Sequence, residues 1–93
     1  MPEDSGPDET VNVWLVAREV DDRDLVTLTY ATADGRHVDV RQLARSHLER
    51  DPATAGDEVS RADLEPVTDP SRQTRFAEEA SRVKRKHDPE DRI

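Results

Sequence analysis

The chain has 93 residues, which suffices for one small domain but leaves little apolar surface for its core. Its net charge is -8 and 39% of its residues are charged, so its surface is expected to be strongly acidic. It contains no cysteine, which excludes a disulfide framework and thiolate catalysis. No apolar run approaches the ~20 residues that span a bilayer, and the first residues are unlike a secretion signal, so the sequence predicts a cytoplasmic protein without a membrane segment.

Asp and Arg predominate among the charged residues. The acids comprise 13 Asp and 9 Glu, whereas 12 of the 14 bases are Arg and only 2 are Lys. Short carboxylates hold water and cations, and they keep a chain soluble where salt strengthens apolar association. The pattern therefore favours a protein from a salt-accumulating cell over the alternative, an ordinary acidic protein from a GC-rich genome, which also prefers Arg to Lys.

The N-terminal half predicts a three-stranded antiparallel meander. Residues 1–10 are acidic, with proline and glycine, and predict a disordered lead-in. The run VNVWLVAREV at 11–20 is rich in β-branched residues and predicts the first strand, which the charged turn at 21–24 ends. Alternating apolar residues predict two further strands, at 25–32 and 36–41.

The turn between the second and third predicted strands decides which side chains share a face. A two-residue loop at 34–35 would pair Ala31 with Val38 and Thr29 with Val40, which puts both valines on the threonine face.

We favour instead a three-residue loop at 33–35, with Gly35 in the left-handed conformation. This register pairs Tyr30 with Val38, and a slip of one residue would move the whole set of side chains to the other face. The apolar side chains that it gathers on one face are Val26, Leu28, Tyr30, Val38 and Val40.

The middle of the chain predicts a short helix at 42–50, in which Leu43, Ala44, His47 and Leu48 form one stripe. Asp51 and Pro52 end this helix. Residues 51–59 predict a loop. Residues 60–63 predict a helical turn with Ser60 as its N-cap.

The longest helix is predicted at 70–87. Asp69 is its expected N-cap and Pro70 its first residue. Its apolar stripe is thin, with Phe76, Ala80 and Val83. Residues 88–93 are expected to form a tail. The fold class is therefore α+β, and residues 11–87 form its single domain.

The first predicted strand carries large apolar side chains on both faces, at Val13, Trp14, Leu15 and Val16. With a four-residue turn at 21–24, Val13 and Leu15 join the apolar face, and Trp14 and Val16 lie on the other. With a turn one residue different, the two sets exchange. Several such side chains left exposed would form a patch of the kind that marks an interaction site.

Two arrangements could cover both faces of this strand. The helices at 42–50 and 70–87 could take one face each, or a second chain could cover one of them. Because both helical stripes are narrow, we favour a homodimer or a docked protein partner over the monomer. The expected interaction face is Val13, Trp14, Leu15 and Val16.

The sequence offers no convincing catalytic, cofactor or metal site. His37 and Asp39 share a strand face, but a closed metal site needs about four ligands. His47 is expected to pack on its helix, and the glycines are too scattered for a phosphate-binding loop. We therefore expect a non-enzymatic protein without a cofactor or a metal.

The last predicted helix is basic within an acidic chain. Its bases are Arg72, Arg75, Arg82, Lys84, Arg85 and Lys86. They could contact phosphates of a nucleic acid or an acidic partner. Bases also favour a helix C-terminus, and the pairs Arg75–Glu79 and Glu78–Arg82 would stabilise the helix, so a structural role is the favoured one.

Several segments together resemble a group of short acidic proteins of halophilic archaea that has no assigned activity. These segments are VWLV-x-R in the first strand, LVTLTYAT-x-DG in the hairpin, LEPV, and the last helix ending in HDP. The resemblance spans residues 13–91 and implies a salt-adapted protein, but it supplies no functional residues. We expect a small protein-interaction module in a salt-adapted cytosol, with accessory nucleic-acid binding or regulation through the basic helix as the alternative.

Overall fold

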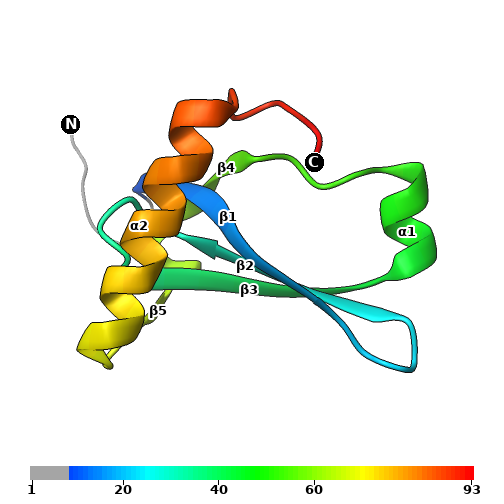
Figure 1. Cartoon of the computed structure of the whole chain (residues 1–93), viewed down its shortest axis with the longest axis horizontal. Helices are drawn as coiled ribbons and strands as arrows, with labels where there is room; N and C mark the ends of the chain where they lie inside the picture. The colour runs from blue at the N-terminus through cyan, green and yellow to red at the C-terminus, as the bar shows by residue number, and fades with distance from the viewer. Residues whose placement is uncertain (1–8) are drawn as a thin grey trace.

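The computed structural model describes residues 9–93, so most of the predicted lead-in at 1–10 lies outside the described residues. The described chain is an α+β structure built on a five-stranded antiparallel sheet (Figure 1). Its elements are β1 (Thr10–Val20), β2 (Leu25–Ala31), β3 (His37–Ala44), α1 (Arg45–Arg50), β4 (Gly56–Ser60), the 3-10 turn η1 (Arg61–Asp63), β5 (Glu65–Pro66) and α2 (Pro70–Lys86). The strand order is β4-β1-β2-β3-β5, so the predicted meander is the centre of a wider sheet.

The two outer strands were not predicted. β4 lies in the segment predicted as a loop, 51–59, and pairs with β1 from Thr10–Ser60 to Trp14–Gly56. Its sequence, GDEVS, has one large apolar residue and two acids, a composition typical of a protected sheet edge and easily taken for a loop. β5 has only two residues, which lie opposite His37 and Val38 of β3.

The predicted helix at 42–50 is wrong in its first third. Residues 42–44 continue β3, where Leu43 lies opposite Val26, and α1 begins only at Arg45. The ladder with β2 satisfies the backbone groups of these residues, so pairing overrides the helical spacing of their side chains. The helix ends at Arg50, just before Asp51 and Pro52, as predicted.

The predicted register of the β2–β3 hairpin is also wrong. Ala31 lies opposite Val38 and Thr29 opposite Val40, which is the register that the apolar pattern disfavoured. The loop has four residues, 33–36, since the backbone N–H of Thr32 donates to the His37 carbonyl at 3.0 Å. Val38 and Val40 therefore lie on the face opposite to Val26, Leu28 and Tyr30.

The β1–β2 hairpin combines a shorter turn with a bulge. Val20 lies opposite Val26 beside the turn, whereas Leu15 lies opposite Tyr30 further along, because the register shifts by one residue at Val16. A bulge of this kind reverses which side chains point to each face. It places Val13 and Leu15 on the side of Tyr30, the outcome that the sequence assigned to a four-residue turn and left open, because the bulge compensates for the shorter turn.

We call the first side of the sheet the Tyr30 face. Its buried side chains are Val13, Leu15, Val26, Leu28 and Tyr30. Leu48 of α1 and Ala53 of the following loop cover them, and Leu43, Val59, Leu64 and Ile93 pack around them. The pieces that close this face are small and come from separate parts of the chain.

We call the other side the Trp14 face, and α2 packs on it (Figure 1). Trp14 contacts Ala80 and Val83 of the helix, while Phe76 packs against Ala31 and Val38. The helix begins as predicted, with the Asp69 carboxylate accepting from the Ser71 backbone N–H at 3.0 Å. None of the helices within residues 9–93 has the length and apolar content needed to cross a membrane.

The segment predicted as a tail, 88–93, is joined to the sheet. Three backbone hydrogen bonds join it there. The N–H of Ala55 donates to the carbonyl of Asp91 at 2.7 Å, that of Gly56 to the carbonyl of Pro89 at 3.0 Å, and that of Ile93 to the carbonyl of Ala53 at 2.8 Å. This segment therefore protects the outer edge at the start of β4 and closes the sheet beside Trp14.

Gly35 brings the β2–β3 turn directly against α2. Its φ angle is +74°, the left-handed conformation predicted for it. A Cβ at this position would collide with the backbone oxygen of Gln73 and lie 2.7 Å from the backbone nitrogen of Ala77. Because both obstacles are helix backbone, neither can rotate away.

We expect Gly35→Ala to lower the free energy of unfolding by roughly 2–4 kcal/mol, since it adds backbone strain to a backbone collision. Urea unfolding followed by the fluorescence of Trp14 measures the change. Ala33→Ser, at an exposed position of the same loop, is the control and should stay within about 0.5 kcal/mol of the parent. Equal stability of Gly35→Ala and the parent would contradict the close packing of turn and helix.

Candidate interaction surface

The predicted interaction face on β1 is covered by the chain itself. Val13 is 0% exposed, Trp14 and Leu15 are each 7% exposed, and Val16 is partly buried. The premise that these side chains would need a partner to cover them is therefore wrong. The arrangement with a helix on each face, which we did not favour, describes how this strand is buried.

Small residues explain why thin helical stripes are enough. Ala80 is 1% exposed and Ala55 is 0% exposed, so α2 and the loop before β4 approach the indole closely. Gly56 lies beneath the indole, where a Cβ would be 3.0 Å from its ring atoms and 3.2 Å from the Cα of Pro89. Close backbone approach thus replaces the bulky side chains that the sequence lacks.

The Trp14 face is covered only in part. α2 lies over the row formed by Trp14, Ala31 and Val38. The next row, Ala17, Thr29 and Val40, follows from the pairs along β1, β2 and β3 and takes no part in the buried hydrophobic clusters that α2 joins. Val40 is 49% exposed, whereas Ala17 and Thr29 are half-buried. Beyond them the strands carry polar side chains, so the bare apolar area is short.

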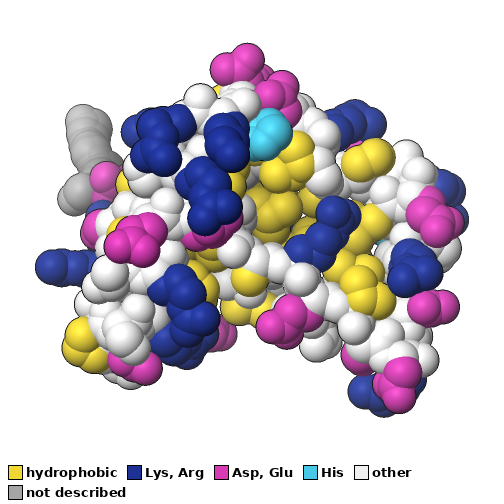
Figure 2. Space-filling view, in the orientation of Figure 1, with side chains coloured by type: hydrophobic (Ala, Val, Ile, Leu, Met, Phe, Trp, Pro, Cys, Tyr) yellow, Lys and Arg dark blue, Asp and Glu magenta, His cyan; other side chains and the backbone are white. Residues whose placement is uncertain are grey.

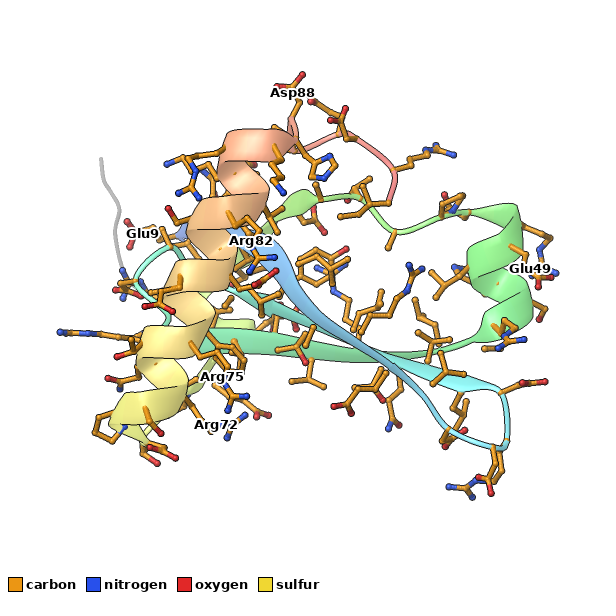
Figure 3. The ribbon with its side chains drawn as sticks, in the orientation of Figure 1. Glu9, Glu49, Arg72, Arg75, Arg82 and Asp88 are labelled. Carbon is orange, nitrogen blue, oxygen red and sulfur yellow. The ribbon has the colours of Figure 1, made fainter. Side chains whose placement is uncertain are left out.

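A basic flank of α2 borders this bare row. Arg72, Arg75, Arg82 and Lys86 are spaced by three, seven and four residues, which places them along one side of a helix. Figure 3 shows the three labelled arginines of α2 on the side of the helix toward the uncovered strands. The guanidinium of Arg72 lies 5.3 Å from the ring centre of Phe76, which is a cation–π contact.

Three of the six bases of α2, Arg75, Lys84 and Lys86, have no side-chain partner within residues 9–93. Arg82 pairs with Glu79 at 3.3 Å, and Arg85 donates to the Ser81 hydroxyl at 3.0 Å. The predicted pairs of Arg75 with Glu79 and of Glu78 with Arg82 are not formed within residues 9–93. All six bases predicted as anion or partner contacts are exposed: Arg72, Arg75, Arg82, Lys84, Arg85 and Lys86.

The charge of the chain is divided between the helix and the rest. Residues 70–86 hold 6 bases and 2 acids, a net charge of +4, so the rest of the chain carries -12 to reach the total of -8. Figure 2 shows the Lys and Arg side chains in a column along α2, and an indented outline between the lower end of this helix and the β1–β2 hairpin. We define the basic–apolar surface as Ala17, Thr29, Val40, Arg72, Arg75 and Phe76.

An ion-pair network centred on Arg41, which the sequence analysis did not predict, lies on the Tyr30 face. The guanidinium of Arg41 lies 4.4 Å from the ring centre of Tyr30 and donates to Asp39 at 2.8 Å and to Asp57 at 2.9 Å. Asp57 belongs to β4 and Arg41 to β3, so this ion pair spans β1 and β2, which lie between them in the sheet. Burial acts to lower the pKa of Arg41, but the two carboxylates outweigh it and raise this pKa.

The histidines do not form a site. His47, expected to pack, is exposed on α1 because Leu48 alone turns to the core. His37 and Asp39 share a face as expected, but Asp39 is engaged by Arg41. The Nδ1 atom of His87 lies 3.6 Å from the Asp91 carboxylate. In residues 9–93 no three His, Cys, Asp or Glu side chains gather closely enough to hold a metal ion.

A groove of about 540 Å³ lies at the β4 edge, between β1 and the C-terminal segment. Trp14 and Pro89 contribute to its apolar floor. Its charged lining is acidic at Asp57, Glu58 and Glu90 and basic only at Arg92, so the groove does not continue the basic flank of α2.

The chain belongs to a family of unknown function, DUF7967, whose model matches residues 7–93. No curated protein and no solved structure matches the chain. The family match extends over both α2 and the sheet, so the elements that build the basic–apolar surface all lie inside the family domain.

Tyr30 is the only tyrosine of the chain, so its ionisation can be followed alone. Its side chain is 1% exposed, and its hydroxyl donates to the Thr54 carbonyl at 2.9 Å. Burial raises the pKa of Tyr30 above 10.0. A raised folded-state pKa means that the neutral hydroxyl stabilises the fold below pH ~10, and that this contribution is lost as pH rises through the folded-state pKa.

We therefore expect the tyrosinate absorbance of the folded protein to appear only above the usual pH range of tyrosine, together with a fall in the free energy of unfolding. Tyr30→Phe removes the hydrogen bond to Thr54, so its free energy of unfolding at neutral pH should be lower by about 1 kcal/mol. The variant should also lack the fall in the free energy of unfolding that the ionisation of Tyr30 causes at alkaline pH. Tyrosinate absorbance that appears in the folded protein within the usual pH range of tyrosine would contradict the burial of the Tyr30 hydroxyl.

Proposed function

We propose that this protein is a small non-enzymatic interaction module that docks an acidic protein partner through the basic–apolar surface. The observation that carries the proposal is the half-exposed Val40 on the sheet face that α2 covers only in part, together with the exposed Arg75 of α2, which forms no ion pair within residues 9–93. The proposal keeps the role expected from the sequence but moves it from Trp14 to the part of the same face that α2 leaves bare.

The composition of this surface supports docking of a protein. Interfaces commonly combine a small apolar centre with a charged rim, and Arg is enriched in them because it stacks and forms bidentate contacts. Here Val40 supplies the centre, Arg72 already stacks on Phe76, and Arg75 has no side-chain partner within residues 9–93. An acidic partner would complete the rim.

The environment that we propose is a salt-adapted cytoplasm. The excess of short carboxylates supports it, since these groups retain water when salt is high. High salt screens the net charge of -8 and strengthens apolar contacts. Under such conditions a short apolar centre would contribute more to docking than it does in dilute buffer.

Nucleic-acid binding through α2 is the second candidate, and the net charge of +4 on this helix favours it. Two observations weigh against it. The rest of the chain carries -12, which repels phosphates, and the one aromatic ring on the helix, Phe76, is partly buried and already stacked under Arg72. Binding to DNA or RNA would weaken steeply with salt, whereas docking around Val40 would be retained.

Photo-crosslinking from two matched positions tests the proposal. Val40 and Val20 are 49% and 48% exposed, but Val40 lies on the Trp14 face with α2, whereas Val20, opposite Val26, lies on the Tyr30 face. We expect the full chain carrying the photoreactive residue p-benzoylphenylalanine in place of Val40 to crosslink an acidic protein in its own cells. The same residue in place of Val20 should give at most a trace of this product.

The charge dependence of the crosslink supplies the control. Arg72→Glu with Arg75→Glu should abolish the product formed from position 40, while Lys84→Glu with Arg85→Glu, the same change of charge near the helix end, should leave it. A nucleic acid crosslinked to position 40, or equal products from positions 20 and 40, would refute the proposal.

A further inference from the structure

We infer that the acidic partner docked by the basic–apolar surface is a second copy of this chain, related to the first by a two-fold axis close to Val40. The inference rests on the proposed function and names its partner. Three properties of the Trp14 face carry it: opposite charges at its two ends, a step in its height, and an area suited to a dimer.

The first property is charge. One end of the Trp14 face carries α2, with its net charge of +4. The other end is the β1–β2 hairpin, whose acids are Glu19, Asp21, Asp22 and Asp24 against the single base Arg23. Asp21 pairs with Arg23 at 3.8 Å and Asp24 with Arg45 at 4.0 Å. Glu19 and Asp22 form no ion pair within residues 9–93.

Such a face is complementary to itself. In a two-fold dimer the same surface of each copy meets the other, so each contact between two different positions occurs twice. A half-turn about an axis through the row of Ala17, Thr29 and Val40 places the basic flank of each copy opposite the acidic hairpin of the other. Arg75 and Glu19, which form no ion pair within residues 9–93, then meet unlike charges rather than like ones.

The second property is shape. A helix with its side chains is ~10 Å thick, so α2 forms a step on one half of the face and leaves the strands lower on the other half (Figures 1 and 2). The same half-turn lays the helix of each copy on the bare strands of its partner. Two such steps interlock, whereas two flat faces would leave the hairpin and the helix far apart.

The third property is area. The molecule measures 44 × 31 × 25 Å overall, so half of any one of its faces is at most roughly 680 Å². Stable specific interfaces bury about 800 Å² on each partner, and weaker ones bury less. A dimer of moderate affinity is therefore expected, with Val40 and its copy in contact near the axis.

A charge exchange between two variants tests the inference. The first variant carries Arg72→Glu and Arg75→Glu, and the second carries Glu19→Arg and Asp22→Arg. The parent should sediment as a dimer of the 10.5 kDa chain. Each variant alone places like charges at both contacts, so its dissociation constant should rise about tenfold or more.

Mixing the two variants should restore a dimer that contains one copy of each, because both of its contacts then join opposite charges. Lys84→Glu with Arg85→Glu, which changes the charge of α2 equally but lies off the flank, should dimerise like the parent. Circular dichroism and urea unfolding establish that the substituted chains are folded, which the exposure of all four positions favours.

The outcomes separate this inference from the proposed function. A monomeric parent at millimolar concentration, or a mixture that stays monomeric, overturns the two-fold dimer. If position 40 then still crosslinks a different acidic protein in cells, the interaction module stands without self-association. If position 40 crosslinks nothing, both ideas fail together.

Discussion

The fold depends on one strand that must be buried on both sides. β1 lies inside the sheet between β4 and β2, and the alternation of its side chains sends Leu15 to one layer and Trp14 to the other, while the bulge at Val16 fixes which face each of them takes relative to the turn. Neither layer can be built from neighbours in sequence alone. The C-terminal half of the chain therefore exists largely to close over this strand, with α1 and the following loop on one side and α2 with residues 88–93 on the other.

Close backbone packing substitutes for bulk in this small core. Gly35 touches the backbone of α2, Gly56 lies under the indole, and Ala80 lets the helix approach the sheet. A helix that packs so closely covers only a narrow part of the sheet. The uncovered row beside it is thus a consequence of how the core is built, and the bases on the outer side of the helix border that row.

Local signals in the sequence predicted what local physics determines. The alternation in β2, the caps at Ser60 and Asp69 and the left-handed Gly35 depend on adjacent residues, and the structure confirms them. The hairpin register, β4 and the burial of Trp14 depend on residues far away in sequence. The register was misjudged because Val38 packs against α2 and Val67, a contact that outweighs its grouping with Tyr30. The acidic β4 gave no apolar signal, and the exposed row could not be recognised before the position of α2 was known.

The position of Trp14 has a consequence for the order in which the chain folds. The β1–β2–β3 hairpins form through contacts close in sequence, whereas the indole is covered by residues 55–93, more than forty positions away. Closing such long loops is slower than forming hairpins. A nascent meander would accordingly carry a bare indole until α2 docks, and this interval is when the polypeptide is most exposed to aggregation. The abundant carboxylates would then act as solubilising groups for the intermediate as well as for the finished protein.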